Sequence, residues 1–121
     1  MERKLTLVVG ASPEPSRYSH LATHRLVGAG HPVVLLGKRT GMIAGLPIHR
    51  DLDADLKVHT ITLYVAPQHQ GELMDELLAL RPQRIIFNPG TEHAAFEAEA
   101  RKNGIEVVEG CTLVMLASGQ F

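Results

Sequence analysis

Short apolar runs alternate along the chain with segments in which apolar residues recur every three or four positions. The apolar runs, which predict strands, are residues 4–9, 32–36, 58–65, 84–87, 105–108 and 112–116. The segments with helical periodicity are residues 17–29, 68–80 and 92–103. This alternation predicts an α/β fold, a three-layer Rossmann-like domain with a mostly parallel sheet and helices on both faces.

The ends and buried faces of the helices also follow from their sequences. We expect Ser16 to cap the first helix and Gly30 to stop it, the second helix to begin near Pro67, and Thr91 to cap the third, which ends at Asn103-Gly104. The residues expected to face the sheet are Tyr18, Leu21, Ala22, Leu26 and Ala29, then Leu73, Met74, Leu77 and Leu78, and finally Ala95, Phe96 and Ala100. Residues 37–57 are rich in breakers and predict irregular structure with one short edge strand at Leu46-Pro47-Ile48.

The composition sets bounds on the class of protein. A chain of 121 residues is the size of one domain, which we expect to cover residues 1–121. Cys111 is the single cysteine, so no intramolecular disulfide can form, and this favours a cytoplasmic location. We expect neither a signal peptide nor a membrane span, since no apolar run is long enough.

Charge is distributed unevenly between the two parts of the sequence. Residues 1–50 hold seven Lys and Arg against two acidic residues, a net charge of +5, whereas residues 51–121 hold five against eleven, a net charge of −6. The basic part would attract an anionic ligand, but its excess is too small and dispersed to indicate a nucleic-acid surface.

Ligands of such sheets bind outside the carboxyl ends of the strands. The segments that follow those ends are Gly10–Ser19, Gly37–Gly41, Ala66–Gln68 and Asn88–Glu92. The first opens a helix, whose free amides, with the hydroxyls of Ser12, Ser16 and Ser19 and the cation of Arg17, could bind a phosphate. The alternative is an ordinary strand-to-helix turn, because the full G-x-G-x-x-G pattern is absent.

The second strand ends in two cations, Lys38 and Arg39. A dehydrogenase that uses NAD has a carboxylate at this place to bind the ribose hydroxyls. Lys38 as a point charge and Arg39 as a fork would instead bind phosphate oxygens, unless both are simply solvated loop charges.

Two further loops carry candidate contacts. In Asn88-Pro89-Gly90-Thr91-Glu92, Gly90 would let the backbone approach a flexible ligand arm, although the segment could serve only to begin a helix. Ala66-Pro67 is expected to form an apolar wall. We expect no metal site, because His20 and His24 share a helix face without further ligands, and no catalytic residues, because no nucleophile and base can be paired from spacing. Cys111 is expected to be a small buried residue at the start of the last strand.

Three motifs resemble the CoA-binding domain family, the Rossmann-type module at the front of the succinyl-CoA synthetase α-subunit that also occurs as small stand-alone bacterial proteins. They are V-V-G-A-S-P-E-P-S-R-Y-S at 8–19, a strand ending in Lys38 followed by G-L-P-I at 45–48, and G-I-E-V-V-E-G-C at 104–111. The chain departs from the family pattern at Leu36-Gly37, where Asn-Pro is frequent, and at Pro89, where Glu is usual.

The resemblance implies coenzyme A (CoA) or an acyl-CoA as the ligand and assigns roles by position. Gly10, Ala11 and Ser12 would line the pyrophosphate turn, supported by Ser16, Arg17 and Ser19. Lys38 would meet the adenosine 3′-phosphate, Ala66-Pro67 would pack on the ligand, and Asn88-Pro89-Gly90-Thr91 would border the pantetheine arm. The synthetase's ligase machinery lies in other domains, so binding without catalysis is the first hypothesis. The alternatives are an enzyme or sensor for NADP or another nucleotide, and a scaffold with a decayed site that forms a homodimer or binds a protein partner.

Overall fold

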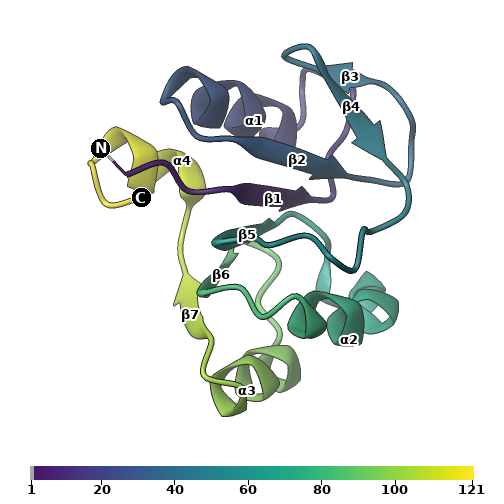
Figure 1. The fold of residues 1–121 in the computed structure, drawn as a ribbon, viewed down its shortest axis with the longest axis vertical. Helices are drawn as coiled ribbons and strands as arrows, with labels where there is room; N and C mark the ends of the chain where they lie inside the picture. Colours follow the sequence, from purple (N-terminus) through teal and green to yellow (C-terminus); the bar gives the residue numbers. More distant parts are fainter. Residues whose placement is uncertain (1) are drawn as a thin grey trace.

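Seven strands form one sheet in the order β3-β4-β2-β1-β5-β6-β7 in the computed structural model, which describes residues 2–121 (Figure 1). The strands are β1 Thr6–Val9, β2 Val33–Leu36, β3 Met42–Ile43, β4 Leu46–His49, β5 Thr60–Leu63, β6 Arg84–Phe87 and β7 Glu106–Glu109. All neighbours are parallel except β3 and β4. The predicted α/β, Rossmann-like fold with a mostly parallel sheet is therefore confirmed. Residue 1, which the prediction of one domain over 1–121 includes, lies outside the described residues.

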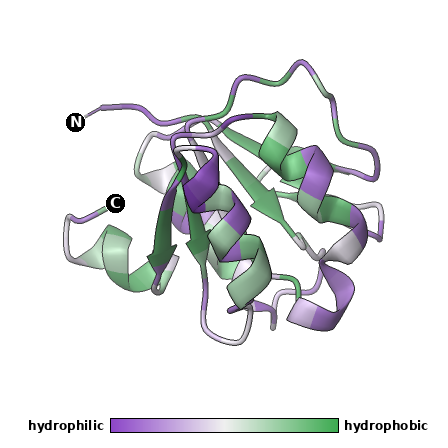
Figure 2. Ribbon diagram, turned by 90° about the horizontal axis from the view of Figure 1, so that it is seen from below, coloured by the Kyte–Doolittle hydropathy of each residue, from purple (hydrophilic) through white to green (hydrophobic). Residues whose placement is uncertain are grey.

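Helices cover both faces of this sheet. On one face, α2 (Gly71–Ala79) and α3 (Ala94–Lys102) pack on a core that includes Leu7, Val9, Ile61 and Phe87. On the other, α1 (Tyr18–Gly28) and α4 (Thr112–Ala117) pack on a core that includes Val8, Leu35 and Ile86. Successive strand residues point to opposite faces, so strands buried on both sides are apolar throughout. Figure 2 shows these hydrophobic strands and the mixed hydropathy of the helices around them.

The last predicted strand is wrong: residues 112–117 form helix α4. The chain leaves the sheet after the amide of Gly110 donates to Phe87 O at 3.2 Å. Met115 and Leu116 then pack against the second core from a helix that lies on α1. A short apolar run does not distinguish a buried strand from a helix by periodicity, and Cys111, half-buried, precedes α4 rather than starting a strand.

The first helix has the predicted end and part of the predicted buried face, Ala22 and Leu26, but not the predicted cap. It stops at Gly30, which has a φ of +89°. Arg17 is the N-cap, not Ser16, and no side chain caps the helix. Tyr18 and Leu21 are 75% and 39% exposed. The residues that the helix buries are Ser19, Ala22, Thr23 and Leu26.

The other helices agree more closely with their patterns. A 3-10 turn, η1 (Pro67–His69), comes before α2, which buries Leu77 and packs Leu73, Met74 and Leu78 against the core as predicted. Helix α3 buries Phe96 and Ala100 and ends at Asn103, but Ala95 is exposed and Glu97 is buried instead. The predicted cap, Thr91, is wrong, because its hydroxyl donates to Asn88 O at 2.8 Å instead of capping the helix. His93 is the N-cap.

The segment predicted to be irregular contains a short hairpin. Residues 46–48 do form a strand, but β4 lies between β2 and the two-residue strand β3, which forms the edge. No helix of residues 2–121 has the length and apolar character needed to cross a membrane.

Candidate functional site

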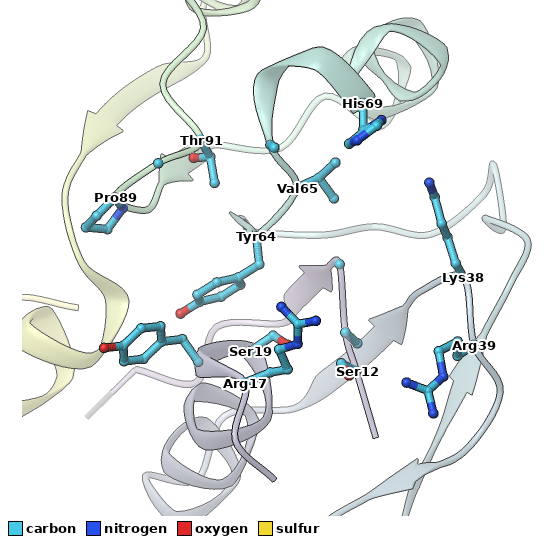
Figure 3. A pocket seen from close by; sticks show the side chains of 15 residues that line it. Ser12, Arg17, Ser19, Lys38, Arg39, Tyr64, Val65, His69, Pro89 and Thr91 are labelled. Carbon is cyan, nitrogen blue, oxygen red and sulfur yellow. The ribbon is translucent and has the colours of Figure 1, made fainter. Parts of the chain in front are cut away.

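A pocket of about 580 Å³ opens at the carboxyl ends of the parallel strands (Figure 3). Its walls come from the loops after β1, β2, β5 and β6 and from the first turn of α1. The lining residues are Gly10, Ala11, Ser12, Arg17, Tyr18, Ser19, Lys38, Arg39, Tyr64, Val65, Ala66, His69, Pro89, Gly90 and Thr91. Segments far apart in the sequence meet here because parallel strands end at the same edge of the sheet.

Most of the residues singled out from the sequence line this pocket, and three do not. Ser16 lies in the exposed turn before α1, and Pro67 is the first residue of η1. Asn88 is buried: its amide nitrogen donates to Thr62 Oγ1 and Leu63 O at 2.8 and 2.9 Å, and its Oδ1 accepts from the amide of Thr112 at 2.9 Å. The side chain of Asn88 therefore holds the loop after β6 in place from below the pocket.

Two glycines let the loops after β1 and β2 approach their neighbours closely. A Cβ on Gly10, whose φ is +92°, would lie 2.8 Å from Tyr64 O. A Cβ on Gly37 would lie 2.2 Å from Ala11 O. At Gly37 the close approach of the first loop leaves no room for a side chain, so this contact requires glycine.

The first turn of α1 presents hydrogen-bond donors to the pocket. The amides of Tyr18 and Ser19 donate to no acceptor within the described residues, because Arg17 provides no side-chain cap. The Ser12 hydroxyl accepts a hydrogen bond from the amide of Glu14 at 3.2 Å and fixes the loop before the helix. Free amides at a helix start carry partial positive charge and bind anions.

Glu14 engages two of the three pocket cations. Its carboxylate lies 2.9 Å from Arg39 Nη1 and 3.5 Å from Arg17 Nε. The hydrogen bond from Arg39 and the charges of both guanidinium groups lower the pKa of Glu14. Within residues 2–121, Lys38 forms no ion pair and extends toward His69 across the opening (Figure 3). Lys38 is therefore the pocket cation that is free for a ligand.

Gln70 joins the two loops on the far side of the pocket. This buried side chain donates to Val65 O at 2.8 Å and to Thr91 O at 2.7 Å, and its Oε1 lies 3.0 Å from His93 Nδ1. Because buried polar groups are costly unless they are paired, this network fixes the loops after β5 and β6 relative to each other.

The sequence reasoning missed four lining residues: Tyr18, Tyr64, Val65 and His69. Tyr64 and Val65 were assigned to a strand over 58–65, but β5 ends at Leu63, so both lie in the loop. The Tyr64 hydroxyl is buried without a hydrogen-bond partner in the described part of the chain, and burial raises its pKa to about 12. The nearby Thr62 and Thr112 hydroxyls bond each other at 2.7 Å. The predicted strand is too long by these two residues, which instead begin the loop that lines the pocket.

A second hollow of about 420 Å³ adjoins the pocket and shares Gly10, Lys38, Val65 and His69 with it. It is also lined by Val9, Leu36, Gly37, Arg50, Gln68, Gly71, Glu72 and Leu73. The two hollows give an elongated ligand two adjoining chambers with Lys38 at their junction.

No group of three or more His, Cys, Asp or Glu side chains is arranged for a metal ion in residues 2–121. The His20 and His24 rings are neighbours, 4.9 Å apart, as their spacing on α1 requires.

Comparison with known proteins identifies the family. Residues 4–117 match the model of the CoA binding domain family. The crystal structure of an uncharacterized protein is 44% identical, with a TM-score of 0.97 and complete coverage of both chains. A protein from Thermus thermophilus is 27% identical, with a TM-score of 0.84 over 98% of this chain and 91% of that one.

A hypothetical protein from Pyrococcus horikoshii is 22% identical, with a TM-score of 0.84 over 96% of this chain and 82% of that one, and shares the fold. No curated protein matches the chain. Since the family model covers nearly the whole sequence, the chain belongs to the CoA binding domain family.

Proposed function

We propose that this domain binds CoA or an acyl-CoA in the pocket at the carboxyl edge of its sheet, without catalysis of its own. The observation that carries the proposal is that one cavity is lined both by the α1 amides and by Lys38, which have no partners among the described residues. CoA has two separated phosphate groups, a pyrophosphate and a 3′-phosphate, and this cavity offers a separate binding group for each.

The residues take roles along the length of the ligand. The pyrophosphate lies against the turn at Gly10, Ala11 and Ser12, with the amide of Ser19 as a donor, and Lys38 meets the 3′-phosphate. Arg17 and Arg39 support these loops through Glu14, Ala66 forms an apolar wall, and Pro89, Gly90 and Thr91 border the pantetheine arm, with the buried Asn88 holding that loop in place. The two adjoining hollows, about 580 and 420 Å³, offer room for a ligand of this length.

Binding fits the lining residues better than turnover does. No serine in the lining shares a hydrogen bond with a histidine within the described residues, and Ser12 is occupied by the amide of Glu14. A nucleophile needs a base within hydrogen-bond reach. We therefore propose a carrier or sensor of CoA in the cytoplasm, where the lone Cys111 would stay reduced.

The test is calorimetric titration of the protein with CoA, dephospho-CoA, NADP and NAD. We expect CoA to bind tightest and dephospho-CoA to bind about tenfold or more weakly, because charge-assisted contacts are lost. Lys38→Ala should remove most of that difference. Lys57→Ala, an exposed lysine that lines neither hollow, is the matched control and should leave all affinities unchanged.

Other results would point to the alternatives. Preference for NADP over CoA would indicate an enzyme or sensor for another nucleotide. Failure to bind any of the four ligands would contradict the proposal and favour a scaffold that acts through a homodimer or another protein.

A further inference from the structure

We propose that Lys38 and Arg50, rather than the adjacent pair Lys38 and Arg39, bind the phosphate on the ribose of the ligand. This inference rests on the proposed function and deepens it, because it names the residue that gives the site its preference for a phosphorylated ribose. Arg50 is not part of the sequence motifs described above.

The sheet brings Arg50 and Lys38 to the same edge. Strands β2 and β4 are parallel neighbours, with Leu36 paired to His49, and the amide of Gly37 donates to His49 O at 2.9 Å. Lys38 and Arg50 therefore follow the carboxyl ends of adjacent strands. Both side chains line the second hollow, together with apolar groups from Leu36, Val65 and Leu73 on which an adenine ring can pack.

Arg39 already forms an ion pair outside the second hollow. Its guanidinium lies 2.9 Å from Glu14, and its side chain points away from that of Lys38 (Figure 3). It lines only the first pocket. Arg39 therefore joins the loop after β2 to the loop after β1, and its charge is largely balanced before a ligand arrives.

Charge balance in the second hollow makes Arg50 necessary. Glu72, in the first turn of α2, lines the same hollow as Lys38. These two side chains alone would have a net charge of zero, which does not attract a phosphate dianion. Arg50 raises the net charge to +1, and it forms no ion pair within the described residues. A lysine point charge beside an arginine fork suits a terminal phosphate with three free oxygens.

The test compares Arg50→Gln with Arg39→Gln by calorimetry, using two pairs of probes: CoA with dephospho-CoA, and adenosine 3′,5′-bisphosphate with AMP. In Arg50→Gln we expect affinity for CoA and the bisphosphate to fall about tenfold, with dephospho-CoA and AMP within twofold of the unmodified protein. Arg39→Gln should change both members of each pair by the same factor, because it loosens the loops. Arg50→Lys, which keeps the charge but loses the fork, should lie between Arg50→Gln and the unmodified protein.

The outcomes separate this inference from the proposed function. If Arg50→Gln weakens both members of each pair equally, or if the selective loss appears in Arg39→Gln, the assignment to Arg50 is wrong. If the unmodified protein binds CoA and dephospho-CoA equally well, the ribose phosphate is not recognised. This inference and the role given to Lys38 are then wrong, whereas CoA binding itself stands. Binding of neither ligand would contradict the proposed function itself. Arg50 is exposed, and circular dichroism with a melting curve will check that its variants fold.

Discussion

The two edges of the sheet use the same kinds of residue in opposite ways. At the amino edge, Lys4 Nζ and Arg84 Nη2 both donate to the backbone oxygen of Phe121, the latter at 2.7 Å. The Phe121 ring lies 4.4 Å from the Arg84 guanidinium and 4.9 Å from the His31 ring. At the carboxyl edge, Lys38 and Arg50 have no such partners among residues 2–121 and line the second hollow.

This difference between the edges distinguishes a cation that stabilises the fold from one that is available to bind a ligand. Arg84 is 7% exposed, and its Nε also donates to Thr60 Oγ1 at 2.8 Å, so the chain itself satisfies the guanidinium. Buried cations must be paired or hydrogen-bonded within the fold, whereas exposed cations stay hydrated until an anionic ligand binds. The amino edge should therefore control stability and the carboxyl edge should control binding.

The largest expected effect is the loss of stability in Arg84→Ala. This change removes two short hydrogen bonds and the contact with the Phe121 ring, and we expect the free energy of unfolding to fall by about 2–4 kcal/mol. Urea unfolding followed by circular dichroism measures it. Arg25→Ala, an exposed arginine on α1, is the control and should change stability by less than about 0.5 kcal/mol. If Arg84→Ala lowered CoA affinity without lowering stability, the contrast between the edges would break down.

A smaller effect at the amino edge depends on pH. Burial, together with the charges of Lys4 and Arg84, lowers the pKa of His31, and burial and the same charges lower that of His59. The amide of Lys4 donates to His31 Nδ1 at 3.1 Å, a contact that needs the neutral ring. The unfolded chain then binds more protons than the folded one below about pH 6.5, so stability is present above that pH and is lost as the pH falls.

Urea unfolding between pH 7.5 and 5 would measure this loss. His31→Asn, whose side-chain oxygen can still accept from Lys4, should show a shallower fall in the unfolding free energy than the unmodified protein. The exposed His24→Asn variant is the control and should follow the unmodified protein. Equal slopes for all three proteins would show that His31 does not titrate with folding.

The smallest expected effect is on stability, from a substitution at the pocket that should not lower it. Tyr64→Phe removes a buried hydroxyl that has no hydrogen-bond partner within residues 2–121, so stability at pH 7 should stay the same or rise by up to about 1 kcal/mol. Because the pKa of Tyr64 is raised, the unmodified protein should lose stability as the pH rises from about 10 toward about 12. The Phe variant should not show this loss. Thermal melts at pH 7 and pH 11 measure both effects, and a destabilised variant at pH 7 would reveal a missed hydrogen bond.

How far the sequence predicts the fold depends on how distinctive each segment is. The run at 84–87 matches β6 residue for residue, because loop-forming residues bound it on both sides. The run at 112–116 has the same composition as a strand but folds as α4, since its apolar residues find their core on α1 rather than along the sheet edge. Tyr18 satisfies the helical spacing and is still exposed, because it lines the open pocket and its neighbour Ser19 takes the buried position in that turn.

The sequence by itself determined the α/β class, the family and the edge of the sheet where the loops of the site gather, because these follow from periodicity and local motifs. Only the tertiary structure decided which cations are free. Lys38 and Arg39 are adjacent in the chain, yet Glu14 engages Arg39, and the parallel pairing of β2 with β4 lets Arg50 line the same hollow as Lys38. Pairing between strands and ion pairs between loops join residues that are distant in sequence, and no local pattern records them.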